Sequence, residues 1–69
     1  MTREQIREAI IEMDCLNRKE AETLATMIFR AAETGKEEDR QKVTAVIDWL
    51  YATDSITLRN GLEMKDLYF

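Results

Sequence analysis

Three glutamates near the start of the sequence, Glu4, Glu8 and Glu12, are spaced four residues apart. On a helix this spacing places all three carboxylates on one face. Such a row could hold a divalent cation or take part in acid–base chemistry. Helical di-metal sites, however, combine glutamates with histidine, which this sequence lacks. Because Arg3 and Arg7 also lie among the three, we interpret the row as a solvated helix face and expect no metal and no cofactor.

Cys15 is the only cysteine of the chain. Arg18 and Lys19 follow it closely, and nearby cations favour the reactive thiolate. No histidine is present to serve as its base, so we interpret Cys15 as a small residue that fills space between two helices. We predict no catalytic residue and no enzyme activity. A small domain without a disulfide is typical of a reducing compartment, and we expect a cytoplasmic protein.

The composition is that of a folded helical domain. Of 69 residues, 45% are hydrophobic and 35% are charged, with two glycines and no proline. This length predicts one domain over residues 1–69. A core of this size contributes only about 3–5 kcal/mol, so we expect a homodimer in which a second chain completes the core. No apolar stretch is long enough to cross a bilayer, and we expect no membrane association.

The spacing of apolar residues predicts an all-α fold with three main helices. The first covers 3–14, with Thr2 as its N-cap. The second covers 18–34: Asn17 and Glu20 form a capping box at its start, and Gly35 ends it. The third covers 36–53. Both connections are short, which favours an antiparallel arrangement of neighbouring helices.

Two interpretations fit the last fifteen residues. The pair Asn60-Gly61 is typical of a β-hairpin, but hairpin pairing here would mix apolar and charged residues on both faces. The alternative is a short helix over 61–67, with Asn60 as N-cap and Glu63 at its third position. We prefer the short helix, preceded by an extended connector.

Aromatic side chains are the most suggestive positive feature, because five of them exceed what three short helices readily enclose. Trp and Tyr are common anchors of protein interfaces. For Trp49, and for Tyr68 and Phe69, packing within the domain is the competing interpretation. We predict a partner-binding site made of Phe29, Trp49, Tyr51, Leu67, Tyr68 and Phe69. We expect acidic side chains to steer the approach of a basic partner surface; these are Glu33, Glu37, Glu38 and Asp39.

DNA binding is the main rival interpretation. In a helix-turn-helix reading, the helix over 18–34 would enter the groove with Asn17, Arg18 and Lys19 leading. The net charge of −4 opposes this, since acidic surfaces repel phosphate. We therefore do not expect nucleic acid as the partner.

Taken together, these features predict a small, non-catalytic protein-interaction module. It would act as a regulator, inhibitor or adaptor by docking on another protein. In size and in its lack of catalytic groups it is similar to the small inhibitors that phages and mobile elements encode, a likeness of kind and not of motif. A helix-turn-helix-like DNA-binding regulator and a structural self-assembly subunit are the alternatives.

Overall fold

The computed structural model describes residues 1–69 and contains four α-helices and no strand. They are α1 (Arg3–Glu12), α2 (Arg18–Thr34), α3 (Glu37–Ala52) and α4 (Leu58–Asp66). The molecule measures 28 × 23 × 18 Å, with a Cα radius of gyration of 10.7 Å. The all-helical prediction is confirmed.

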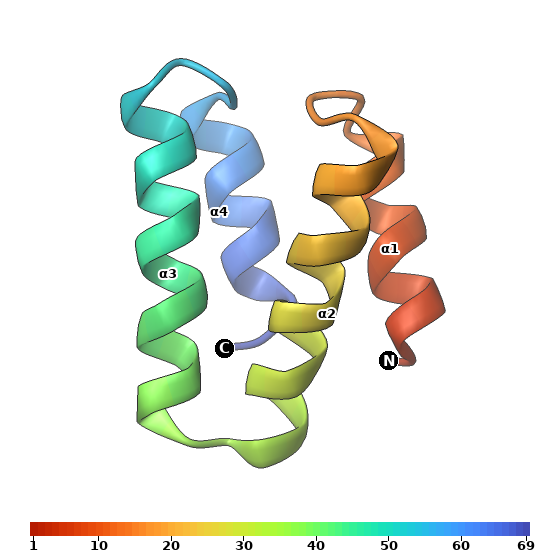
Figure 1. Cartoon of the computed structure of the whole chain (residues 1–69), viewed down its shortest axis with the longest axis vertical. Helices are drawn as coiled ribbons and strands as arrows, with labels where there is room; N and C mark the ends of the chain where they lie inside the picture. Colours follow the sequence, from red (N-terminus) through yellow and green to blue (C-terminus); the bar gives the residue numbers. More distant parts are fainter.

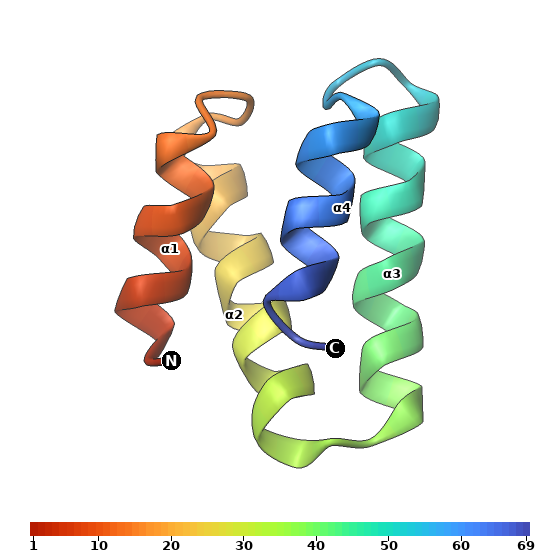
Figure 2. The ribbon, with the colours of Figure 1, turned by 180° about the vertical axis from the view of Figure 1, so that it is seen from behind.

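The chain reverses its direction at each of its three turns (Figure 1). Successive helices pack on one another, α1 on α2, α2 on α3 and α3 on α4. From behind, α4 lies nearer the viewer and between α2 and α3, so it covers one side of the α2–α3 pair (Figure 2). No element passes in front of the opposite side of that pair in Figure 1.

The starts of α1 and α2 follow from local hydrogen bonds that the sequence encodes. Asn17 Oδ1 accepts the Glu20 N–H at 2.8 Å, and Glu20 Oε1 accepts the Asn17 N–H at 3.1 Å. Thr2 and Gln5 form the same reciprocal pair at the start of α1. These capping boxes satisfy backbone N–H groups that a helix start leaves without partners. The second helix accordingly has the predicted bounds.

The end of α2 and the start of α3 also lie close to their predicted positions. Gly35 has φ +64°, the left-handed conformation that glycine adopts without a steric penalty. Helix α3 begins one residue later than predicted and ends one residue earlier. Helix α1 ends two residues early, at Glu12, and Asp14 in the following turn has φ +54°.

The last helix is where the prediction needs correction. The short helix is present and the hairpin is not, but the helix begins at Leu58 instead of residue 61 and ends at Asp66 instead of residue 67. Its N-cap is Thr57, whose Oγ1 accepts the Asn60 N–H at 3.1 Å. Threonine is a good N-cap, and this choice starts the helix earlier, so that Gly61 lies inside the helix and is buried.

Thirteen buried hydrophobic residues form a single core cluster to which all four helices contribute. The members are Ile6, Ile10, Ala21, Leu24, Ala25, Ile28, Ala31, Val43, Ile47, Leu50, Ile56, Met64 and Tyr68. None of the helices combines the length and the apolar character that a membrane crossing requires.

Candidate interaction surface

An open apolar groove of about 300 Å³ runs between α2 and α3. We call it the α2/α3 groove. Its apolar lining consists of Leu16, Leu24, Met27, Val46, Trp49 and Leu50. Lys19, Glu20 and Thr23 form its polar edge on α2. Leu24 and Leu50 are buried residues of the core, so the floor of the groove is continuous with the hydrophobic core.

The groove is open because the chain covers only one side of the α2–α3 pair. On the covered side, Met64 of α4 is completely buried and packs in the core with Ile47 of α3. No residue of α1 or α4 lines the groove. Trp49, one of the largest apolar side chains of the protein, is therefore 63% exposed.

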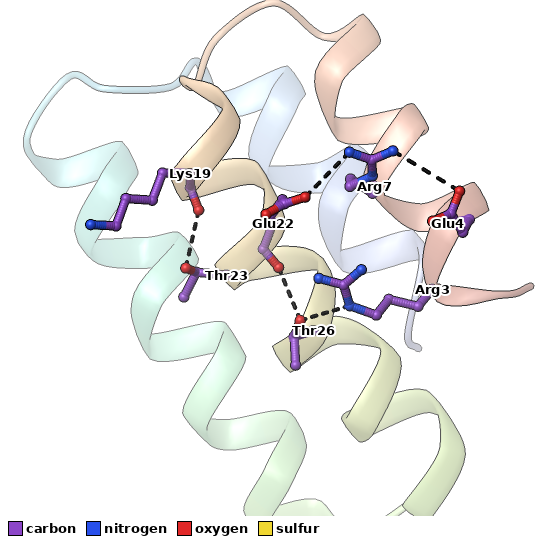
Figure 3. A network of polar contacts seen from close by, with 7 residues as sticks. All are labelled: Arg3, Glu4, Arg7, Lys19, Glu22, Thr23 and Thr26. Carbon is purple, nitrogen blue, oxygen red and sulfur yellow. Dashed lines mark hydrogen bonds and ion pairs between the residues drawn. The ribbon is translucent and has the colours of Figure 1, made fainter.

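The two long edges of α2 differ in character. Toward α1, Arg7 lies within 3.3 Å of Glu22 and 4.0 Å of Glu4, and Arg3 Nε donates to Thr26 Oγ1 at 2.9 Å. Figure 3 shows the Arg7–Glu22 and Arg3–Thr26 contacts joining the two helices, while the Arg7–Glu4 contact lies within α1. Polar side chains thus close the α1–α2 seam, whereas on the opposite edge of α2 the partly buried Met27 faces the open groove.

Lys19 stands apart from that network. Its backbone carbonyl accepts the Thr23 hydroxyl at 3.0 Å, but its side chain extends away from α1 (Figure 3). The ammonium takes part in none of the five ion pairs. Glu20, beside it, is engaged in the cap of α2. The α2 edge of the groove therefore carries an unpaired cation.

The structure does not gather the six predicted partner-binding residues on one surface. Trp49 lines the α2/α3 groove, but Tyr51 lies on the other side of α3, where it borders a small cleft with Leu58 and Leu62 of α4. These three exposed residues are named here the α3/α4 patch. Phe29 is partly buried and shares the α1-facing side of α2 with Thr26, three residues before it.

The end of the chain packs back onto the bundle. Tyr68 is only 6% exposed, and its hydroxyl shares a 2.6 Å hydrogen bond with Thr44 Oγ1. Its ring is thus a core element and offers no free face to a partner. Leu67 is partly buried against the core. Only Phe69 remains exposed, at 74%, with the Arg40 guanidinium 5.9 Å from its ring centre.

The predicted steering carboxylates lie at the α2–α3 turn, at the end of the molecule opposite the turn after α3 (Figure 1). Asp39 accepts the Thr34 hydroxyl at 2.6 Å, and Glu38 pairs with Lys42 at 3.4 Å. Eleven residues separate Glu38 from Trp49, about 16 Å along the helix. These acids therefore do not border the groove near Trp49.

Two kinds of group were candidates for chemistry, the Cys15 thiol and the glutamates of α1. Partial burial raises the pKa of the Cys15 thiol, an effect opposed by a hydrogen bond with Asn60. Glu4 lies near Arg7. No group of three or more His, Cys, Asp or Glu side chains comes together in the structure.

Sequence reasoning missed several residues of the exposed apolar surfaces, namely Leu16, Met27, Val46, Leu58 and Leu62. For two of these residues the sequence does contain a usable pattern. Met27 and Val46 widen the apolar stripes of their helices, and a stripe wider than one neighbour covers leaves an exposed edge.

Comparisons of this chain with protein-family models, with curated proteins and with solved structures gave no match.

Proposed function

We propose that the protein is a small, non-catalytic interaction module that docks on another protein through the α2/α3 groove. In this role it acts as a regulator, inhibitor or adaptor in the cytoplasm. The observation that carries the proposal is the exposure of Trp49 at the edge of an apolar groove that no part of the chain covers. Tryptophan is among the residues most enriched at the energetic centres of interfaces.

The surroundings of Trp49 support this role. Met27 and Val46 flank it with flexible and branched apolar surface, and the groove floor rests on core residues. A side chain inserted here would displace water from apolar surface. The favourable free energy of this burial is about 25 cal/mol for each Å². Helix α2 is held by its caps, and both helices are held by the core that they share, so that little ordering is needed on binding.

Homodimerisation remains part of the proposal, although the core does not require it. Thirteen buried residues from four helices already pack together within one chain. A dimer would have to use the surfaces left over, the α2/α3 groove or the α3/α4 patch. Sedimentation velocity of the wild-type protein distinguishes the monomer from the dimer.

The proposal is tested by affinity capture from a nuclease-treated lysate of the native source, with three immobilised baits. They are the wild-type chain, Trp49→Glu in the groove, and Leu62→Glu in the α3/α4 patch. Both substitutions place the same charge on an exposed helical residue, at 63% and 55% exposure, so each should leave the circular dichroism melt near that of the wild type.

We expect the wild type and Leu62→Glu to retain one stoichiometric protein that Trp49→Glu loses. Equal capture by all three baits would contradict the proposed surface. Loss with Leu62→Glu alone would move the site to the α3/α4 patch. Recovery of no protein by any bait would contradict a docking function, and a DNA-shift titration against salt would then test the nucleic-acid alternative.

A further inference from the structure

We propose that the occupant of the α2/α3 groove is an amphipathic helix of a partner protein whose apolar ridge is flanked by acidic side chains. This inference rests on the proposed function and specifies the chemistry of the partner. The acidic α2–α3 turn led us to expect a basic partner surface. The cations along the α2/α3 groove instead favour an acidic one.

The shape of the groove favours a helix. Two packed helices leave a furrow along their line of contact, and α4 fills the corresponding space on the far side of the pair (Figure 2). The open side runs from Lys19 to Met27 along α2, a span of about 12 Å, or about two helical turns, and Leu16 extends it beyond the start of the helix. A partner helix with apolar residues three and four positions apart fits such a furrow, as in other helix-in-groove complexes.

The charges along the α2 edge favour acidic flanks on that helix. Lys19 lines the groove at one end. Arg30 follows Met27 by three residues, which places it on the same edge of α2 about three turns from Lys19. Neither cation takes part in an ion pair. A carboxylate at either end of a docked helix would meet one of them.

Glu20 lines the groove and keeps its negative charge, so the α2 edge carries two unpaired cations against one carboxylate that the helix cap holds in place. Glu20 accepts the Asn17 N–H in the cap of α2, and Lys42 on the α3 edge pairs with Glu38. The net charge of −4 comes from the rest of the surface. Its field falls off within about 8 Å at physiological salt, so at the Lys19 end of the groove, away from the acidic α2–α3 turn, the unpaired lysine favours an acidic flank.

The fluorescence of Trp49 reports on binding, because Trp49 is the only tryptophan and lines the groove. The probe is a designed, end-capped helical peptide of about 18 residues, long enough to be helical, without tryptophan. It carries a leucine stripe flanked by glutamates. A matched peptide carries lysines in place of the glutamates. Both are titrated into the full chain, below their own self-association, while Trp49 emission is recorded.

We expect the glutamate peptide to shift Trp49 emission to shorter wavelength and to bind at least about tenfold more tightly than the lysine peptide. Lys19→Glu should weaken the binding of the glutamate peptide by about fivefold to tenfold. Lys36→Glu is the control. It makes the same charge change at an exposed lysine of the α2–α3 turn, and we expect it to leave the affinity within about twofold.

Three results would overturn the inference. Tighter binding of the lysine peptide, or equal binding of both, would reject acidic flanks while leaving the groove as the docking site. An emission shift that follows protein concentration without peptide would assign the groove to a second copy. No shift with either peptide would reject a helix as occupant, and the capture experiment with Trp49→Glu would still decide separately whether the groove docks a protein.

Discussion

The two sides of α3 carry similar residues but have different surroundings. On the side toward α4, Ile47 is 1% exposed and Met64 packs in the same core. On the side toward the α2/α3 groove, Val46 and Trp49 are equally apolar, yet Trp49 lies at the surface. The chain supplies a fourth helix for one side and nothing for the other.

This difference separates residues that hold the fold from residues that are available for binding. Burial of Ile47 and Met64 explains their apolar character through stability alone. Exposure of Trp49 does not, because an exposed tryptophan adds little to the free energy of unfolding of the isolated chain. An apolar groove that is left open, beside a well-packed interface on the same helix, is typical of a surface that another molecule covers.

The largest contrast should come from truncating one residue on each side of α3. Ile47→Ala leaves a cavity in the core, and we expect it to lower the free energy of unfolding by about 2–4 kcal/mol. Trp49→Ala should change it by less than about 1 kcal/mol. Urea unfolding followed by circular dichroism measures both. Similar losses for the two variants would mean that Trp49 is a core residue and that the groove is not free.

A smaller effect is expected at the buried hydroxyl of Tyr68. Tyr68→Phe removes its 2.6 Å hydrogen bond with Thr44 and leaves that threonine without its partner, which should cost about 1–2 kcal/mol of stability. Thermal melts of Tyr68→Phe and of the exposed control Tyr51→Phe provide the comparison. An unchanged melting temperature for Tyr68→Phe would mean that the hydrogen bond with Thr44 contributes nothing to stability.

The same tyrosine predicts a pH dependence. Burial raises the pKa of the Tyr68 phenol above its usual value of 10.0, against the opposing effect of its hydrogen bond with Thr44. The folded state therefore holds the phenolic proton more tightly than the unfolded state does. The resulting stability is complete below pH 10 and is lost as the pH rises through the folded pKa. The urea midpoint of the wild type should fall more steeply above pH 10 than that of Tyr68→Phe, and parallel curves would contradict this assignment.

The smallest expected effect is a gain in stability at the covered side of α3. A Cβ added at Gly61 would lie 3.5 Å from Ile47 Cγ2, at ordinary van der Waals distance. Gly61→Ala should therefore stabilise the protein by about 0.5–1 kcal/mol, because alanine is the better helix former. Gly35→Ala is the opposite case, since φ +64° disfavours any side chain. Chemical unfolding of both variants should give shifts of opposite sign, and a loss of stability in Gly61→Ala would indicate that the α3–α4 contact has no spare room.

The sequence predicts this fold well where local hydrogen bonds define the elements. Asn17, Glu20 and Gly35 determine both ends of α2 without help from the rest of the molecule. The start of α4 was mispredicted because Thr57 and Asn60 are both suitable caps. The choice between them depends on a tertiary contact, since the earlier start buries Gly61 close to Ile47.

The candidate site was less accessible to sequence reasoning. Helical spacing identifies apolar faces but does not say which neighbour covers them. Trp49 and Tyr68 are both aromatic residues beside apolar stripes, and only packing shows that Tyr68 is enclosed and Trp49 is not. The acidic residues 37–39 were assigned to steering because their charge is visible in the sequence, whereas only the structure shows that the groove lies at the other end of α3, beside Trp49.

The central claim is that the α2/α3 groove is the surface that a partner covers. It is tested most directly by the amide and indole ¹H–¹⁵N spectrum of the labelled chain, recorded with and without the protein that the wild-type bait captures. We expect the Trp49 indole signal and the amides of 16–27 and 46–50 to shift, while the amides of α4 stay in place. Shifts at Tyr51, Leu58 and Leu62 with an unchanged Trp49 indole would contradict the claim.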